Sequence, residues 1–306
     1  MSSGTGPTLP PDRSHIGTEQ RNPQSAELHR LDAAGIVTLL NRENRAVLAA
    51  LDAAAPALTA FIAAIEPGFF AGGRLIYVGA GTSGRLGVLD ASEAPPTFQV
   101  EPGRIIGLIA GGDAALRRSS ESKEDEPDGA QSELDALKLT ANDAVLGIAA
   151  GGTTPYTVGA LTIAKRAGAT TGLLTCAEVP RPAGADHLIV LATGPEPLTG
   201  STRMKAGTAT KLALNTISTA LMVRLGKVYG NLMVDVRATN AKLSDRAARI
   251  VATLTGLDRP ASFALLGRAG GAVKTAVAMQ RLGIDRAEAD RRLTTVDGRL
   301  DRLLDR

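Results

Sequence analysis

Five short apolar runs, each followed by a glycine or polar loop, most strongly restrict the folds open to this sequence. They are RLIYVGAG, RIIGLIAGG, DAVLGIAAGG, ATTGLLTC and HLIVLAT, which begin at Arg74, Arg104, Asp143, Ala169 and His187. Helical patterns alternate with these runs. Strands that alternate with helices usually form a parallel sheet that lies between two layers of helices. The sequence therefore predicts a three-layer α/β/α domain with a five-stranded parallel sheet.

The composition supports an aliphatic core and excludes several classes of partner. Aromatic residues make up 3% of the 306 residues and Trp is absent, so Ala, Leu and Val must fill buried strands and helices. The 34 Lys and Arg are interspersed with 31 Asp and Glu, which disfavours nucleic acid as a partner despite a net charge of +3. The single cysteine, Cys176, excludes an intramolecular disulfide and is expected to be buried, and the scattered histidines disfavour a metal site.

The N-terminus has no apolar segment typical of a secretory signal,. No apolar run is expected to be long enough for a membrane span, which needs roughly 18 residues. We therefore expect a soluble, cytoplasmic protein that does not contact a membrane.

Composition and break signals divide the chain into four regions. Gly, Pro and Ser are enriched at the N-terminus, the strand-like runs occupy the middle, and helical patterns interrupted by GLDRPAS and GIDRAEA fill the end. The expected regions are a disordered tail (1–17), N-terminal helices (18–64), the domain that contains the sheet (65–228) and a C-terminal three-helix subdomain (240–306).

Several helix boundaries can be predicted. Pro67-Gly68 is expected to stop the second N-terminal helix, and Pro95-Pro96 to stop the helix that starts near Gly84,. A long helix follows TGSTRMKAG, with Thr199 or Ser201 as its candidate N-cap,.

The stretch GAGTSG after the first run fits the pattern G-x-G-x-x-G through Gly79, Gly81 and Gly84. A strand, a glycine turn and a helix N-terminus together present unpaired N–H groups and a positive dipole end to an anion. Dinucleotide-binding domains share this pattern, but they also need an acidic residue roughly 20 residues further on. Asp113 lies 29 residues after Gly84, which is late for this role but does not exclude it. On this pattern alone, a nucleotide therefore stays open as a ligand.

Hydroxyl side chains in two loops favour a terminal phosphate over a bridging pyrophosphate. Thr82 and Ser83 lie inside the first turn, and Thr153 and Thr154 follow the third run. Both loops leave the carboxyl ends of strands, where open α/β sheets bind ligands. A sugar phosphate is thus preferred, and its predicted phosphate site comprises Gly81, Thr82, Ser83, Gly84, Thr153 and Thr154.

Carboxylates suited to proton transfer occur in two places. Glu93 would close the helix before Pro95-Pro96, where the negative dipole end favours the protonated form that an acid catalyst needs. An ordinary surface glutamate is an equally good interpretation. The cluster SSESKEDEPDG offers further candidates that spacing alone does not separate, namely Glu121, Glu124, Asp125 and Glu126.

Long stretches of the chain resemble the N-acetylmuramic acid 6-phosphate etherase family. They are GAGTSGRLGVLDASEAPPTF, Gly147 to Tyr156, TGSTRMKAGTATKLALNT and GKVYGNLMVDVRATNAKL, while TEQRNPQS matches the usual start of the family. The resemblance covers nearly the whole chain. It implies a sugar isomerase (SIS) domain, a homodimer, a role in peptidoglycan recycling and no metal or redox cofactor.

The resemblance also implies a reaction and its residues. The lactyl ether of N-acetylmuramic acid 6-phosphate is cleaved to N-acetylglucosamine 6-phosphate and D-lactate by elimination and rehydration. By position, Glu93 is the acid that protonates lactate and Glu124 is the base at C2, while Ser201 and Lys205 are further substrate contacts. Many relatives carry Ser-Gly-Arg-Thr-Pro where this chain has GGTTP from Gly151, so a serine hydroxyl and an arginine charge are missing here.

Two further expectations concern Glu93 and the competing functions. A helix from Gly84 to Glu93 spans about 15 Å, which is long for one sugar phosphate, so Glu93 is predicted to serve a site completed by the partner subunit. A non-catalytic sugar-phosphate sensor, like glucokinase regulatory protein, would not need both Glu93 and Glu124. An aldose–ketose isomerase would release no lactate, and a dehydrogenase would bind NAD(P)H.

Overall fold

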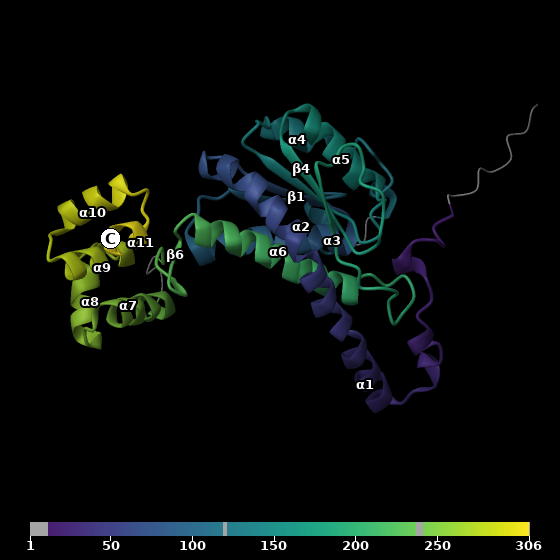
Figure 1. Cartoon of the computed structure of the whole chain (residues 1–306), viewed down its shortest axis with the longest axis horizontal. Coiled ribbons are helices and arrows are strands. Elements are labelled where there is room, and N and C mark those ends of the chain that lie inside the picture. The colour runs from purple at the N-terminus through teal and green to yellow at the C-terminus, as the bar shows by residue number, and fades with distance from the viewer. Residues whose placement is uncertain (1–11, 119–120, 237–240, 306) are drawn as a thin grey trace, which may run out of the picture. The chain divides into compact units, whose positions relative to one another are not determined.

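The five predicted runs form one parallel sheet in the computed structural model, which confirms the predicted fold class (Figure 1). The strand order is β2-β1-β3-β4-β5. Corresponding residues pair in register, such as Gly79 with Ile148 and Leu173 with Leu188. The strands are β1 (Leu75–Gly79), β2 (Ile105–Ile109), β3 (Ala144–Ile148), β4 (Thr170–Thr175) and β5 (His187–Val190).

The structure describes residues 12–118, 121–236 and 241–305. Their contacts divide the chain into two units. The first unit contains Met1–Val88 and Ile106–Leu214, and the second contains Leu89–Ile105 and Asn215–Arg306. The sheet belongs almost entirely to the first unit.

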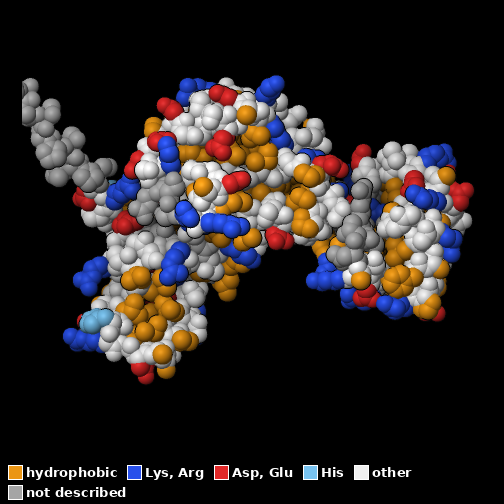
Figure 2. All heavy atoms as spheres, turned by 180° about the vertical axis from the view of Figure 1, so that it is seen from behind, with side chains coloured by type: hydrophobic (Ala, Val, Ile, Leu, Met, Phe, Trp, Pro, Cys, Tyr) orange, Lys and Arg blue, Asp and Glu red, His pale blue; other side chains and the backbone are white. Residues whose placement is uncertain are grey.

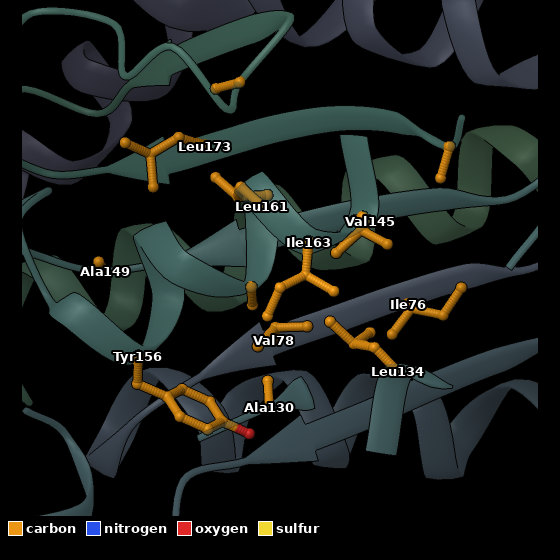
Figure 3. Packing of buried hydrophobic residues seen from close by; sticks show 14 of the residues in the cluster. Ile76, Val78, Ala130, Leu134, Val145, Ala149, Tyr156, Leu161, Ile163 and Leu173 are labelled. Atoms are coloured by element: carbon orange, nitrogen blue, oxygen red, sulfur yellow. The ribbon is translucent and has the colours of Figure 1, made fainter. Parts of the chain in front are cut away.

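One face of the sheet packs against α4 (Gln131–Leu137) and α5 (Pro155–Arg166). Alternate strand residues point into this layer, as the two-residue period of a strand requires. Figure 3 shows Ile76, Val78 and Val145 meeting Leu134 from α4 and Ile163 from α5. Aliphatic side chains therefore dominate this core, as the composition predicted.

The other face of the sheet is covered by α2 (Arg45–Phe70) and by the start of α3 (Gly81–Phe98). Glycines allow this close approach. A Cβ on Gly172 would lie 2.8 Å from the ring of Phe61, and a Cβ on Gly87 would lie 2.8 Å from Cβ of Tyr77. Both faces are thus buried, which explains the continuous apolar runs.

The predicted stop of the second N-terminal helix is wrong. The helix α1 (Ala33–Glu43) is followed by α2, which passes through Pro67 and ends at Phe70. Its last turn keeps a hydrogen bond from the N–H of Ala71 to the carbonyl of Pro67. Gly68 also packs so closely on the backbone of Asn142 that a Cβ would lie 2.6 Å from its carbonyl oxygen, so tertiary packing outweighs the break signal.

The expected disordered tail extends too far into the chain. Residues 1–11 lie outside the described residues, but Ile16 is 4% exposed and Thr18 is fully buried. Short 3-10 turns follow, at Gly17–Glu19, Pro23–Ser25 and Leu28–Arg30. From about residue 16 the N-terminal segment is therefore packed within the first unit.

One helical stretch is longer and more apolar than the sequence expectation allowed. Ala33–Phe70 contains an 18-residue window that could cross a membrane by length and composition, and 28% of that window is buried. The buried positions of α2 recur every three or four residues, which is the pattern of a helix that packs one face on a protein core. They are Val47, Ala50, Ala54, Leu58, Phe61, Ile65 and Phe69.

The second unit contains the end of α3, the second half of α6 (Lys205–Arg224) and a short antiparallel hairpin of β6 (Val228–Tyr229) and β7 (Leu232–Met233). Within residues 241–305 there are five helices rather than the three predicted. They are α7 (Ala241–Thr255), α8 (Arg259–Arg268), α9 (Val273–Leu282), α10 (Arg286–Thr295) and α11 (Leu300–Leu304).

Local caps explain this subdivision of the C-terminal helices. Asp258 accepts a hydrogen bond from the N–H of Ala261, and Asp285 accepts one from Glu288, so each starts a new helix. Gly283 ends α9 with a φ of 65°. The helices enclose their own core, which includes Val251, Leu265 and Val277.

Candidate functional site

The carboxyl ends of β1 and β3 lie side by side and create the candidate site. In the order β2-β1-β3-β4-β5 the chain crosses to opposite sides after β1 and β3, which leaves a crevice between their carboxyl ends,. After Gly79 the chain turns at once into α3, and after Ile148 a six-residue loop leads into α5. The two hydroxyl loops therefore meet.

A cavity of about 190 Å³ occupies this crevice. Small-ligand sites usually exceed roughly 300 Å³, so it fits the phosphate end of a sugar phosphate better than the whole molecule. Six of the ten predicted site residues line it: Gly81, Thr82, Ser83, Glu124, Thr153 and Thr154. The rest of the lining comprises Ala80, Ala150, Gly151, Thr202 and three residues of the N-terminal segment, Arg13, Ile16 and Glu19.

The lining hydroxyls are not used by the protein itself. Within the described part of the chain, Thr82, Ser83, Thr153 and Thr154 donate and accept no side-chain hydrogen bonds. Thr154 is the N-cap residue of α5, yet its hydroxyl does not cap that helix. The first turns of α3 and α5 both begin at this cavity, so positive dipole ends accompany the hydroxyls. This combination can hold an anion.

The predicted glycines have different positions in the site. Gly81 has a φ of 53°, and a Cβ there would lie 3.2 Å from Oε1 of Glu124. Gly84, which is also predicted to belong to the phosphate site, does not line the cavity. A Cβ on Gly84 would lie 2.6 Å from the carbonyl oxygen of Gly79 and 2.7 Å from Ile109, so its role is to let α3 pack on the sheet.

Glu124 is singled out from the acidic cluster by its position. Its carbonyl accepts a hydrogen bond of 3.0 Å from the N–H of Tyr156, which ties it to the first turn of α5. Its partly buried carboxylate lines the cavity. Asp125 and Glu126 do not line it, and Glu126 pairs with Lys123 instead. The role of Glu124 in proton transfer stays a prediction.

Lys205 does not line the cavity, contrary to its assignment as a substrate contact. Its ammonium group is buried and donates to Glu43 at 3.1 Å. Glu43 also accepts from the amide of Asn22 at 2.6 Å. The lysine thus belongs to an internal ion pair that joins α1 to the first turn of α6.

The predicted caps of α6 are replaced by a distant carboxylate. Glu196 is fully buried and accepts hydrogen bonds from the N–H groups of Lys205 and Ala206. Burial raises the pKa of Glu196, although these two N–H groups and the Lys205 charge oppose that shift. Ser201 is another predicted contact outside the lining, whereas its neighbour Thr202 lines the cavity.

Glu93 belongs to the second unit and its side chain is exposed. The prediction that it closes its helix is wrong, because α3 continues through Pro95 and Pro96 to Phe98. Ala94 and Phe98 are buried on this last turn, and their packing offsets the two missing N–H donors. The catalytic assignment of Glu93 therefore rests on the sequence motif and stays a prediction.

Sequence reasoning missed Arg13, Ile16, Glu19 and Thr202 as lining residues. Glu19 lies in TEQRNPQS, which resembles the start of the etherase family, although this resemblance implies no role for the individual residues. This match was the available signal for Glu19, and TGSTRMKAG was the signal for Thr202. Arg13 precedes both motifs, in the part of the chain expected to be disordered.

Cys176 is 2% exposed, which confirms the prediction that it is buried. Burial raises the pKa of its thiol to about 12, against a hydrogen bond with Thr210 that lowers it. The thiolate is therefore scarce near neutral pH, and Cys176 is unsuited to be a nucleophile.

The chain is similar to several known proteins. The model of the glucokinase regulatory protein N-terminal SIS domain matches residues 58–165. The chain is 52% identical to N-acetylmuramic acid 6-phosphate etherase from Gloeobacter violaceus, over 95% of each chain. It is 49% identical to the protein of that name from Deinococcus radiodurans, over 94% of each. An Escherichia coli protein of solved structure covers 66% of this chain and 97% of its own, at 16% identity and a TM-score of 0.47.

Proposed function

The chain belongs to the N-acetylmuramic acid 6-phosphate etherase family, and from this membership we propose that it cleaves the D-lactyl ether of N-acetylmuramic acid 6-phosphate. The products are N-acetylglucosamine 6-phosphate and D-lactate. The observation that carries the proposal is identity of about 50% over nearly the full length of both chains. It is supported by a cavity that holds Glu124 together with hydroxyls that have no side-chain hydrogen bonds within the described residues.

The proposed reaction is an elimination followed by rehydration, which makes the enzyme a carbon–oxygen lyase. The sugar ring opens to the C1 aldehyde, which acidifies the C2 proton. A base removes that proton, the C3–O bond breaks, and an acid protonates the departing lactate oxygen. Water then adds to C3 of the unsaturated aldehyde and a proton returns to C2. Two carboxylates suffice for these transfers without a cofactor.

Glu124 is our candidate for the base at C2. Its carboxylate lies beside Gly81 at the start of α3, in the same cavity as the hydroxyls that we assign to the phosphate. Glu93 is our candidate for the acid, because the motif DASEAPP carries it in this family. We assign the phosphate to Thr82, Ser83 and Thr154, with Thr153 beside them.

A homodimer is part of the proposal. Apolar side chains gather on the surface over α1 and the segment before it (Figure 2). Val37 is 57% exposed there, and Leu48 at the start of α2 is 64% exposed. A second copy of the chain would cover such a surface and would also complete a cavity too small for the whole substrate. We place the enzyme in the cytoplasm, where the substrate would be recycled.

The test is release of D-lactate from N-acetylmuramic acid 6-phosphate. In ¹⁸O water the label should enter at C3 of the sugar and not in lactate, and in D₂O deuterium should enter at C2. Label in lactate would instead indicate attack at the lactyl carbon. Binding of the sugar phosphate without any lactate release would favour the sensor, and interconversion of aldose and ketose phosphates would favour the isomerase.

The shared site is tested by mixing subunits. Dimers formed from Glu93→Gln and Thr82→Ala chains should recover part of the activity if Glu93 serves the cavity of its partner. Each variant alone should be weakly active. No recovery in the mixed dimers would overturn the shared arrangement and leave the etherase activity itself intact.

A further inference from the structure

The cavity at the ends of β1 and β3 has an unfavourable charge balance for a phosphate. Two carboxylates line it, Glu19 and Glu124. A phosphate ester carries up to two negative charges near pH 7, so carboxylates on the lining of its site oppose its binding. Hydroxyls and helix N-termini supply partial positive charge, and a full positive charge on the lining would lessen the repulsion further.

Arg13 can provide this positive charge. Among the described residues that line the cavity, it is the single Lys or Arg. Its guanidinium forms no ion pair and no hydrogen bond within the described part of the chain. An arginine fork that the protein leaves unused can bind two oxygens of one phosphate.

The backbone around Arg13 is anchored at the cavity rather than free. The carbonyl of Arg13 accepts a hydrogen bond of 3.0 Å from the N–H of Ile16. Ile16 is 4% exposed, and its own carbonyl accepts a bond of 2.9 Å from the N–H of Glu19. Ile16 also packs on the β3 loop, since a Cβ on Gly151 would lie 3.7 Å from it. This turn holds Arg13 beside the hydroxyl loops.

We propose that Arg13 is the phosphate-binding cation of this site and that the N-terminal turn from Arg13 to Glu19 is part of the substrate-binding surface. The inference rests on the proposed function, because it assumes a phosphorylated sugar in the cavity. Arg13 acts by binding and not by proton transfer. Its removal should therefore affect KM and leave kcat nearly unchanged.

The first test replaces Arg13 by glutamine and measures D-lactate release. Loss of a charge-assisted hydrogen bond to phosphate should raise KM about 10- to 100-fold, with kcat within about twofold. Arg21→Gln is the matched control, because Arg21 is exposed in the same segment, has no partner in the described chain and does not line the cavity. Equal KM values for the two variants would overturn the inference.

The second test moves the charge from the N-terminal turn to the β3 loop. Thr153 lines the same cavity from the β3 loop, so Thr153→Arg in the Arg13→Gln background should recover most of the lost affinity. Recovery supports a role of charge and excludes a general defect of the N-terminal turn. A double variant as weak as Arg13→Gln, with an unchanged melting temperature, counts against the proposal.

A binding measurement separates this inference from the proposed function. Calorimetry compares N-acetylglucosamine 6-phosphate with N-acetylglucosamine, and Arg13→Gln should weaken binding of the phosphorylated sugar alone. If Arg13-dependent binding occurs but the natural chain releases no lactate, the etherase proposal fails and the inference stands. If lactate is released and Arg13→Gln binds the phosphosugar normally, the inference fails and the etherase proposal stands.

Discussion

The two ends of the strand pair β1 and β3 use polar residues in opposite ways. At the amino ends, Arg74 and Asp143 precede the strands and bind each other. At the carboxyl ends, Thr82 and Thr154 follow the strands, and their hydroxyls bind nothing else in the described chain. Because the strands are the same, the difference lies in how completely the protein satisfies its own polar groups.

The amino end is fully satisfied. Asp143 accepts hydrogen bonds from the backbone and guanidinium of Arg74 and from the N–H and hydroxyl of Thr140. Burial works to raise the pKa of Asp143, but these bonds outweigh it and lower the value to about 2. Arg74 also donates to the carbonyl of Leu137. Polar groups arranged this way hold the fold together.

The carboxyl end is left open to a ligand. Within the described chain, its hydroxyls and the guanidinium of Arg13 lack protein partners that would compete with a phosphate. A site of this kind contributes little to stability, so its residues can be changed with effects on binding or catalysis rather than on folding. Four substitutions test this division.

The largest effect is expected from Glu124→Gln, which removes the proposed base. We expect kcat to fall about 10²- to 10⁴-fold, with a melting temperature close to that of the natural chain. Asp125→Asn is the control, since Asp125 is the exposed neighbour outside the cavity. D-lactate release is the measurement. A Glu124→Gln enzyme with normal kcat would exclude it as the base.

Lys205→Met tests whether Lys205 stabilises the fold or binds the substrate. Removing the ammonium leaves the carboxylate of Glu43 without its charge partner in a largely buried position. We expect a loss of about 3 kcal/mol in the free energy of unfolding and an unchanged KM in the folded fraction. Lys211→Met, on the exposed face of α6, is the control. A raised KM with normal stability would instead support the original assignment of Lys205 as a substrate contact.

Asp143→Asn tests, through the pH dependence of stability, how much the ion pair at the amino ends of β1 and β3 stabilises the fold. The pKa of Asp143 is about 2 in the folded chain, below its ordinary value of 3.8. Its stabilising contribution is therefore fully present above about pH 4 and is lost as pH falls through 2,. We expect the variant to lose about 2 kcal/mol at pH 7 and to lack this acid-dependent decline. Denaturant unfolding at pH 7, 4 and 2 measures the free energy of unfolding of both chains. A natural chain that is equally stable at pH 4 and pH 2 would contradict the prediction.

Thr154→Val should have the smallest effect. Its hydroxyl has no partner in the described chain, so stability should stay within about 0.5 kcal/mol, while lost binding to phosphate should raise KM roughly fivefold. Thr157→Val is the control, because Thr157 is buried in α5, the helix that Thr154 precedes, and its hydroxyl also lacks a partner among the described residues but lies outside the cavity. A fall in stability with an unchanged KM would indicate that Thr154 stabilises the fold and does not bind the phosphate.

Sequence reasoning identified the strands and the hydroxyl loops because both are local signals. An apolar run of about five residues before a glycine loop reports a buried strand wherever it occurs, as at Leu75–Gly79,. It erred at helix ends. Pro67 and Pro95 lie inside helices because side chains or backbone from elsewhere pack on their last turns, and such contacts leave no mark in the neighbouring residues.

By itself, the sequence determined the parallel sheet, the place of the two hydroxyl loops at its carboxyl edge and the family to which the chain belongs. Only the tertiary structure separated Glu124, which lines the cavity, from Lys205, which an ion pair with Glu43 occupies. Only the structure also brought Arg13 and Glu19 to that cavity. The physical reason is that strand formation follows local periodicity, whereas the partner of a charged side chain depends on residues that are distant in sequence, 162 positions apart in the case of Lys205 and Glu43.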